Sequence, residues 1–526
     1  MKKLLFTPLK LLTYFLVLSA LSALFWVERN FGIPGVDQLL YHIVHAGEMP
    51  LTADRELVES FALWIVLLPL VAAVALTWID RGLTRRIRAR RADSPRLLRV
   101  WSWRAPALVM ATTVFLMNEV SAFSYLANLH SDSDYFADNY IPPLNATLSP
   151  GEPKNLVLIY LESVEATYGD AELFGRNLLG PLAGLPGVSF DDFQQMPGTS
   201  WTMGGLVGSQ CGVPLKNVFL SARDWNSYGL SYGINEVGEM LARFLPGAVC
   251  LSDILDRYGY TNVFVGGASL GFAGKGTFLR DHAYHQAYGR EELLAAGVEP
   301  ELNSSGFYDD AVFAFAKAKF KELHAAGRPF NLTLLTMDAH GPDGFISRAC
   351  AERGATTFTD IIDCTAAQAA EFVRFIVDSG YLADTRVVIL GDHLAMRNPV
   401  YEILEQAPRR TIFNRFIADV TPTKNRETIV HFDLLPTILD FVGLRVDSGR
   451  LALGHTALGP LSEPLPEERL AQLQDELPKR SKAYLTLWHA APAVELAAKP
   501  AGGLAARPLD TASSGDGVID AASQEL

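Results

Sequence analysis

The chain has 526 residues, 49% of them hydrophobic, and a formal net charge of −13. This length exceeds one average domain and is sufficient for a large buried core. The acidic balance leaves no basic face to neutralise phosphates, so nucleic-acid binding is not expected. The hydrophobic excess is concentrated near the N-terminus, which indicates a membrane segment.

Three N-terminal apolar stretches are long enough to cross a bilayer core of about 30 Å. They cover about residues 9–26, 61–79 and 106–126. The first could be a signal anchor or a cleaved signal peptide, but no small-x-small cleavage site ends it. We therefore expect it to be retained, and the sequence predicts a membrane region with three spans over residues 1–127.

Arginines between the second and third stretches predict the orientation. Residues 80–104 contain nine arginines, whereas residues 28–59 contain two. The positive-inside rule places this arginine-rich loop and the N-terminus in the cytoplasm. We therefore expect a multi-pass inner-membrane protein whose part after about residue 127 lies in the periplasm. Glu119 would lie within the third span, where a carboxylate is either functional or neutral and packed against neighbouring helices.

The rest of the chain divides by composition. Residues 128–154 are polar and proline-rich and are predicted to form a linker. Within residues 155–495, short apolar runs alternate with helical patterns, which is typical of an α/β domain with a mostly parallel central sheet. Residues 496–526 are rich in alanine, glycine, serine and aspartate and are predicted to be disordered.

The cysteines are Cys211, Cys250, Cys350 and Cys364. None forms a CxxC pair, so neither a thiolate zinc site nor a thioredoxin-type redox motif is expected. Cys350 with Cys364 would close one short loop, which leaves Cys211 with Cys250. Four buried free thiols are the open alternative.

Acidic and histidine residues follow three of the apolar runs. Glu162 ends the run 155–161, His340 follows the run 331–336, and Asp392 and His393 end the run 386–391. Because ligands bind beyond the carboxyl ends of parallel strands, these side chains are predicted to share one site. Oxygen and imidazole ligands suit Mn²⁺, Mg²⁺ or Zn²⁺. Taken singly, each residue could instead be a capping carboxylate or a buried, hydrogen-bonded histidine.

A hydroxyl group is available for nucleophilic chemistry at Thr199. This residue follows Pro197-Gly198 and precedes a helix-compatible stretch, so it could begin a helix. A hydroxyl at a helix N-terminus suits attack on an anionic phosphate, and a metal could activate it. In isolation, Thr199 or Ser200 would more readily be interpreted as an N-cap.

These motifs together resemble the sulfatase-like branch of the alkaline phosphatase superfamily. The resemblance covers about residues 155–460 and rests on Leu161-Glu162-Ser163, Gly198-Thr-Ser-Trp-Thr202, Asp338-Ala-His340 and Gly391-Asp392-His393. Within this branch, the chain is similar to lipoteichoic acid synthases and, more closely, to the phosphoglycerol transferases of periplasmic glucan synthesis. The resemblance implies an alkaline-phosphatase-like α/β sandwich that binds one divalent metal ion, with Mn²⁺ favoured.

The resemblance also implies roles for individual residues. Glu162, Thr199, Asp392 and His393 match the metal ligands, with Thr199 as the nucleophile, and His340 matches the histidine that contacts the substrate phosphate. Lys275 and Arg280 lie in the segment that supplies further substrate contacts. True sulfatases carry a C/S-x-P-x-R signature, and residues 199–203 lack its proline and arginine, which argues against sulfate ester hydrolysis.

The implied activity is transfer of glycerol phosphate from phosphatidylglycerol to a periplasmic glucan through a phosphothreonine-type intermediate. One alternative is a phosphoethanolamine transferase acting on lipid A or another envelope glycan. A hydrolase with water as the acceptor is another. A catalytically inactive, membrane-anchored binding module is the alternative of a different class.

Overall fold

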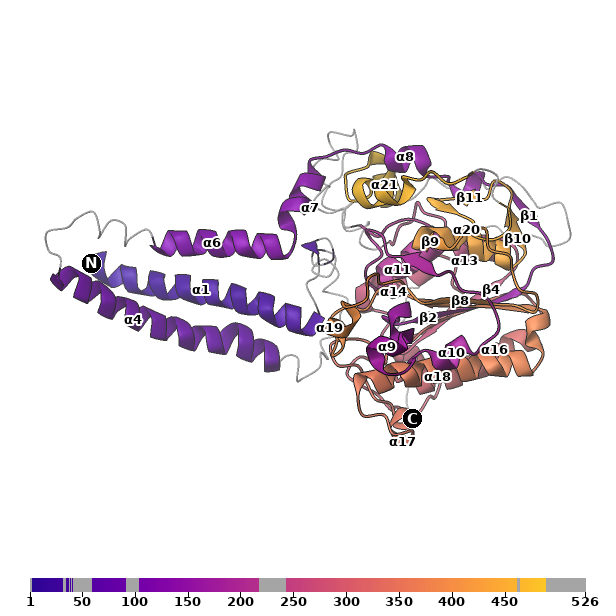
Figure 1. Ribbon diagram of the computed structural model, residues 1–526, viewed down its shortest axis with the longest axis horizontal. Coiled ribbons are helices and arrows are strands. Elements are labelled where there is room, and N and C mark those ends of the chain that lie inside the picture. Colours follow the sequence, from indigo (N-terminus) through magenta and orange to yellow (C-terminus); the bar gives the residue numbers. More distant parts are fainter. Residues whose placement is uncertain are drawn as a thin grey trace, which may run out of the picture.

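The computed structural model describes residues 2–31, 35, 36, 38, 40, 59–90, 104–216, 243–460 and 464–488 (Figure 1). The predicted disordered tail, residues 496–526, lies outside the described residues.

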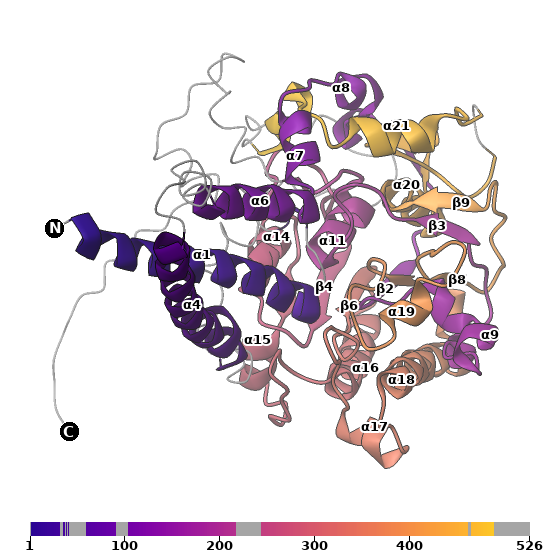
Figure 2. The same ribbon diagram turned by 60° about the vertical axis from the view of Figure 1, so that its left-hand side comes forward.

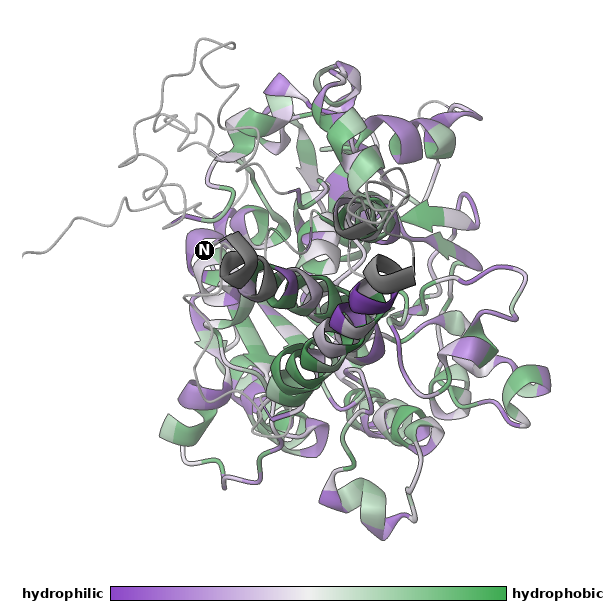
Figure 3. Cartoon of the chain, turned by 90° about the vertical axis from the view of Figure 1, so that its left-hand side faces the viewer, coloured by the Kyte–Doolittle hydropathy of each residue, from purple (hydrophilic) through white to green (hydrophobic). Residues whose placement is uncertain are grey.

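Apolar helices lie side by side at one end of the molecule (Figure 1). They are α1 (Lys2–Phe31), a second helix formed by η2 (Ala62–Leu67) and α4 (Leu68–Arg90), and α6 (Arg104–Glu119). Two helices, Pro8–Arg29 and Glu59–Arg86, are long and apolar enough to cross a membrane. Large apolar side chains such as Trp78 and Val71 are exposed on the second of these helices. In Figure 3, much of this helix has the colour of hydrophobic residues.

The third predicted span, residues 106–126, is not a single straight helix. After α6 ends at Glu119, α7 (Ala122–Leu129) continues at an angle of 73°. The break follows from Ser121, whose φ of 56° is left-handed and interrupts the helical path. At 1.5 Å per residue, α6 alone is about 24 Å long, short of a bilayer core of about 30 Å. The prediction of three spans is therefore corrected to two clear spans and one bent pair of helices, with Glu119 at the bend.

The segment predicted to be a linker contains short ordered elements. They are α8 (Tyr135–Asn139), η3 (Pro143–Asn145) and β1 (Leu148–Pro150). β1 pairs antiparallel with β10 (Leu444–Val446), which attaches this segment to the C-terminal part of the following domain.

A six-stranded sheet in the order β5-β4-β6-β2-β7-β8 forms the centre of that domain. Its strands are β2 (Asn155–Leu161), β4 (Thr261–Gly266), β5 (Gln286–Tyr288), β6 (Phe330–Leu335), β7 (Thr385–Gly391) and β8 (Asn414–Ile417). All neighbouring pairs are parallel except β7 with β8. The predicted α/β domain with a mostly parallel sheet is confirmed.

Helices cover both faces of this sheet (Figures 1 and 2). One face carries α11 (Thr202–Cys211), α13 (Leu251–Arg257), α14 (Lys275–Asp281) and α20 (His431–Phe441), and the other carries α10 (Gly180–Ala183), α16 (Asp309–Ala325) and α18 (Phe358–Asp378). Along β2, Leu158 and Tyr160 pack into the first core, and Val157 and Ile159 pack into the second. Because both faces of the strand are buried, its sequence is continuously apolar rather than alternating.

Shorter elements complete the domain. They are η4 (Ala166–Gly169), α9 (Ala171–Phe174), β3 (Asp192–Gln194), η6 (Phe272–Gly274), α15 (Arg290–Ala295), α17 (Arg348–Glu352), η7 (Tyr381–Ala383), α19 (Tyr401–Leu404), β9 (Thr428–Val430), β11 (Arg450–Leu451), β12 (Gly454–His455), α21 (Arg469–Glu476), α22 (Lys482–Leu485) and η8 (Thr486–Trp488).

Both cysteine pairs considered from the sequence form disulfides in the structure. Cys211 at the end of α11 is bonded to Cys250 before α13, and Cys350 in α17 is bonded to Cys364 in α18. The alternative of four free thiols is therefore wrong. Such bonds persist in oxidising compartments.

Candidate metal centre

Three buried side chains with metal-ligand chemistry meet at the C-terminal edge of the sheet. Glu162 follows β2, and Asp392 and His393 follow β7. Leu161 and Gly391 are parallel partners, so the ends of these two strands lie side by side. His393 Nε2 lies 3.5 Å from Glu162 Oε1 and 3.4 Å from Asp392 Oδ2. We refer to Glu162, Asp392 and His393 as the ligand cluster.

Two buried atoms of the ligand cluster, Asp392 Oδ2 and His393 Nε2, lack a hydrogen-bond partner among the described residues. The opposite atoms of the same side chains are anchored, since Asp392 Oδ1 accepts from the backbone N–H of Ser163 at 2.8 Å and His393 Nδ1 pairs with the Leu394 carbonyl oxygen at 2.8 Å. Leaving a buried polar atom unpaired costs about 1–3 kcal/mol. A divalent cation at this point would satisfy both atoms, so the donor set fits a metal ion.

The charges in the ligand cluster favour the same conclusion. Burial lowers the pKa of His393, but the Asp392 and Glu162 carboxylates outweigh it and raise this pKa to about 9. Burial, with the Glu162 charge, raises the pKa of Asp392 to about 7. Burial also acts to raise the pKa of Glu162, but the nearby His393 imidazole brings it down to about 2. Two carboxylates around one imidazole favour a divalent cation, which would replace the imidazole proton.

Hydroxyl residues that the sequence reasoning missed hold Glu162 in place. Ser163 Oγ donates to Glu162 Oε1 at 2.8 Å, and Thr202 Oγ1 donates to Glu162 Oε2 at 3.2 Å. Thr336 Oγ1, just past the neighbouring strand β6, accepts from the backbone N–H of Glu162 at 2.9 Å. A signal was available, because Ser163 and Thr336 are hydroxyl residues at the ends of predicted strands.

His431 and Gln195 hold the loop that carries Asp392 and His393. His431 Nε2 donates to the Asp392 carbonyl oxygen at 2.7 Å, and burial lowers the pKa of His431 to about 4, so this imidazole is neutral. The Leu394 backbone N–H donates to Gln195 Oε1 at 2.9 Å. No local sequence pattern indicated that either residue contacts this loop, because each reaches it from a distant segment.

Glycines let α11 approach the ligand cluster closely. A Cβ at Gly205 would lie 2.1 Å from the Asp392 carbonyl oxygen, and one at Gly208 would lie 2.8 Å from Thr199 Cγ2. A Cβ at Gly204 would lie 3.2 Å from Thr199 Cα. These positions exclude larger residues because the helix packs directly against Thr199 and the backbone of Asp392.

Thr199 is fully buried in the loop before α11. Its hydroxyl donates to the Met196 carbonyl oxygen at 2.8 Å and accepts from the Met196 backbone N–H at 3.1 Å. α11 begins at Thr202 with Trp201 as its N-cap, so the prediction that Thr199 begins the helix is wrong. The reason is local, since the bonds to Met196 close a turn that includes Gly198 at a φ of 80°.

His340 and Lys275, two of the three predicted substrate contacts, lie near the ligand cluster. His340 follows β6, its Nδ1 lies 2.8 Å from the Gly341 carbonyl oxygen, and its charge contributes to the lowered pKa of Glu162. Lys275 is buried at the start of α14. Burial lowers the pKa of Lys275 to about 8, and Glu162 is the strongest opposing charge.

Arg280, the third predicted substrate contact, lies at the opposite end of α14. Its guanidinium is largely exposed and lies 3.6 Å from Asp281. Its place in the site remains a prediction from the resemblance.

A family model described as Sulfatase matches residues 216–444. Phosphoglycerol transferase I from Salmonella newport (strain SL254) is 36% identical over 369 residues, which cover 66% of this chain and 46% of that protein. The chain therefore spans about half the length of the curated relatives it matches. Among solved structures, a protein in the alkaline phosphatase superfamily from Vibrio parahaemolyticus is 21% identical with a TM-score of 0.46, covering 63% of this chain and 76% of that one. The lipoteichoic acid synthase LtaP from Listeria monocytogenes is 15% identical with a TM-score of 0.44, covering 61% and 80%.

Proposed function

We propose that this chain, whose sulfatase-family domain relates it to phosphoglycerol transferase I, is a membrane-anchored, metal-dependent phosphoglycerol transferase. Its donor is phosphatidylglycerol and its acceptor is a periplasmic glucan. The observation that carries the proposal is the ligand cluster with its two unpartnered buried atoms. The apolar N-terminal helices would anchor the catalytic domain at the periplasmic face of the inner membrane, beside a donor that stays in the bilayer.

One divalent ion, with Mn²⁺ favoured over Mg²⁺ or Zn²⁺, would be held by Glu162, Asp392 and His393, with Thr199 as the fourth ligand. When bound, such an ion stabilises charge on phosphoryl oxygens and activates a ligated hydroxyl. Ser163 and Thr202 orient Glu162 toward it through their hydrogen bonds.

Thr199 would supply the nucleophile. A rotation about χ1 would free its hydroxyl from Met196. The hydroxyl would pass its proton to a water molecule within the site, and its oxygen would attack the phosphorus of phosphatidylglycerol. The bond from phosphorus to the diacylglycerol oxygen breaks, and His340 donates a proton to that leaving oxygen. Lys275 offers a buried cation to a phosphoryl oxygen. A glucan hydroxyl then gives its proton to His340 and attacks the same phosphorus, and the released Thr199 oxygen takes a proton from water.

The ligand cluster is tested by Asp392→Ala in the full-length protein. We expect the purified variant to lose bound metal and transferase activity, because the three remaining ligands cannot hold the ion in place of four. Metal content by mass spectrometry, diacylglycerol release and the melting temperature should be measured together. Asp378→Ala, at an exposed position on α18, is the control and should retain both metal and activity. Near-normal metal and turnover in Asp392→Ala would contradict the proposed site.

The nucleophile is tested by incubating the protein with phosphatidylglycerol and no acceptor. We expect diacylglycerol release and a glycerol phosphate adduct on the peptide that contains Thr199. Thr199→Ala should abolish both, and Ser200→Ala should retain both. Thr202→Val should slow the reaction, because it removes a hydrogen bond to Glu162, but should leave the adduct at Thr199. An adduct on Thr202 would reassign the nucleophile.

Donor and acceptor need separate measurements. Release of diacylglycerol from phosphatidylethanolamine but not from phosphatidylglycerol would favour the phosphoethanolamine transferase alternative, and release from neither would favour the inactive binding module. Mass spectrometry of periplasmic glucans and lipid A from a deletion strain identifies the acceptor, and loss of phosphoglycerol from the glucans is the expected result.

A further inference from the structure

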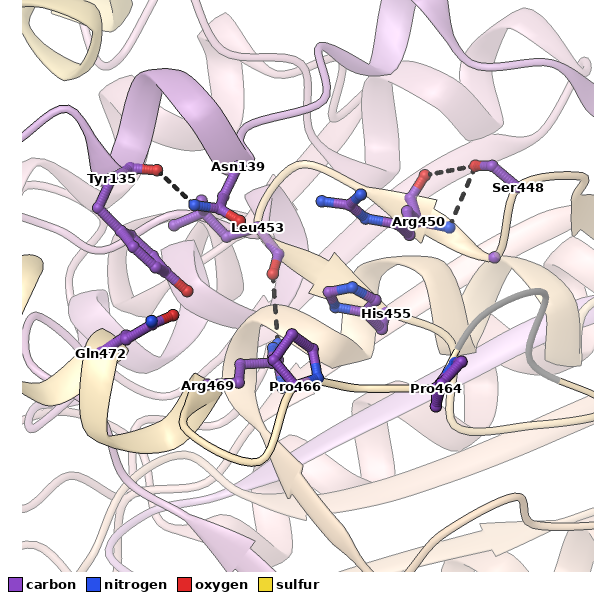
Figure 4. Close-up of a pocket in the computed structure, with 11 residues that line it drawn as sticks. Tyr135, Asn139, Ser448, Arg450, Leu453, His455, Pro464, Pro466, Arg469 and Gln472 are labelled. Carbon is purple, nitrogen blue, oxygen red and sulfur yellow. Dashed lines mark hydrogen bonds between the residues drawn. The ribbon is translucent and has the colours of Figure 1, made fainter.

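A cavity lies between α8, β11, β12 and α21 (Figure 4), and none of the residues that line it belongs to the ligand cluster. Its volume of about 140 Å³ is well above the roughly 10–15 Å³ that one water molecule requires. The polar side chains that line it include Tyr135, Asn139, Arg450, His455, Arg469 and Gln472.

The residues that line this cavity include two arginines and no carboxylate. Arg469 donates to both carboxylate oxygens of Asp433, at 2.7 and 3.2 Å, and Arg426 lies 3.2 Å from the same carboxylate. The single negative charge of Asp433 is therefore shared by two guanidinium groups. Arg450 adds a third, and no carboxylate or carbonyl oxygen in the described part of the chain pairs with its guanidinium. A ligand in the cavity would therefore meet the positive charge of Arg450, which no carboxylate of the described residues pairs with.

Neutral hydrogen-bond donors surround the same space. Burial raises the pKa of Tyr135, so its hydroxyl keeps its proton and can donate. Burial and the charge of Arg469 lower the pKa of His455 to about 4, so this imidazole is neutral and offers one N–H. In Figure 4, Tyr135 and Gln472 lie on one side of the cavity, with Arg450 and His455 on the other. Donors that approach from opposite sides suit a tetrahedral oxyanion better than a flat carboxylate.

We propose that this cavity binds a phosphate ester, with Arg450 as its main contact and Tyr135 and Gln472 as further donors. Guanidinium groups bind phosphate through paired hydrogen bonds, and an unpaired guanidinium in a polar cavity is suited to that contact. The ester could belong to a lipid headgroup or to a soluble phosphoglycerol compound. The site is separate from the ligand cluster, and its existence does not rest on the proposed transferase activity.

The first test is calorimetric titration of the full-length protein in detergent with sn-glycerol 3-phosphate. The Asp392→Ala background removes the metal-dependent site, so the remaining binding belongs to the cavity. In that background we expect Arg450→Gln to weaken binding at least tenfold. Arg445→Gln changes an exposed arginine on β10 outside the cavity and should leave the affinity unchanged. The titration is repeated with metal-loaded protein in which Asp392 is intact, where glycerol phosphate should bind at two sites. Arg450→Gln should weaken binding at one of these sites, and Arg445→Gln should weaken neither.

The second test asks which source of phosphate ester the cavity takes. Native mass spectrometry of the full-length protein in mixed micelles with phosphatidylglycerol counts the bound lipids. A bound lipid that Arg450→Gln removes and Arg445→Gln retains supports a headgroup, whereas Arg450-dependent binding of glycerol phosphate alone supports a soluble ester. If neither probe depends on Arg450, the proposal is overturned.

Discussion

At the scale of single residues, one buried carboxyl near the site stands out because no hydrogen bond satisfies it. Asp338 is fully buried, and neither of its carboxylate oxygens has a partner among the described residues. Its neighbour Asp309 accepts from the Met337 backbone N–H at 2.6 Å and from Thr365 Oγ1 at 3.1 Å. Burial and the Asp309 charge raise the pKa of Asp338 well above its usual value, and burial raises that of Asp309 to about 7. Burial and the repulsion between the two charges therefore favour the protonated form of this pair.

This pair predicts a pH-dependent stability. Because the folded-state pKa values lie above the unfolded ones, the stabilisation is fully present below about pH 4 and is lost as the pH rises through about 7. We expect the wild-type melting temperature to fall between pH 5 and pH 9 and that of Asp338→Asn to fall less. The two falls in melting temperature should differ by a few degrees, since about 1 kcal/mol shifts the melting temperature by about 2–4 °C. Thermal melts across this range measure it.

The matched control is Asp378→Asn, at an exposed position, whose melting curve should track the wild type at every pH. A difference between Asp338→Asn and wild type that stays constant with pH would mean that Asp338 does not titrate in this range.

At the scale of elements, α11 links the loop that carries Thr199 to the ligand cluster. Ser209 and Tyr160 join it to β2 through a hydrogen bond of 2.7 Å, and the Cys211–Cys250 disulfide fixes its C-terminal end. Its glycines then set how closely it approaches Asp392 and Thr199. The helix is therefore a rigid support for the site, and its small residues are required by packing.

Gly205→Ala tests this packing. Alanine favours a helix over glycine by about 1 kcal/mol, but a Cβ here would lie 2.1 Å from the Asp392 carbonyl oxygen. Overpacking of this kind costs about 1–3 kcal/mol and should displace Asp392. We expect a lower melting temperature and weaker metal binding, measured by thermal melts and metal titration. Gly180→Ala, where a Cβ meets nothing within 4 Å, should change neither. An unperturbed Gly205→Ala protein would show that the helix can shift without cost.

At the scale of the whole molecule, the number of membrane crossings decides on which side of the membrane the α/β domain lies. Lys10 and Asp80 form an ion pair at 2.7 Å, which joins the start of α1 to α4 and makes the first two helices a hairpin. A hairpin alone would leave the domain on the same side as the N-terminus. The two disulfides favour an oxidising compartment on the opposite side, so the bent pair α6–α7 is expected to cross as well.

Reporter fusions test this topology. An alkaline phosphatase reporter after residue 460 should be active, because that enzyme requires an oxidising compartment, and the same reporter after residue 92 should be inactive. A fluorescent reporter that matures only in the cytoplasm should give the opposite pattern. If the fluorescent reporter after residue 460 matured and the alkaline phosphatase reporter there were inactive, the bent pair would not cross the membrane.

The sequence by itself determined the parallel α/β architecture and the meeting of Glu162, Asp392 and His393. Both follow from local patterns: continuous apolar runs form strands buried on two faces, and parallel strands bring the residues after them to one edge. Tertiary structure alone decided the start of α11, the bend near Glu119 and the unpaired Arg450. It also decided that His431 supports Asp392. These features depend on contacts between segments far apart in the chain, and periodicity within a short window carries no information about such partners.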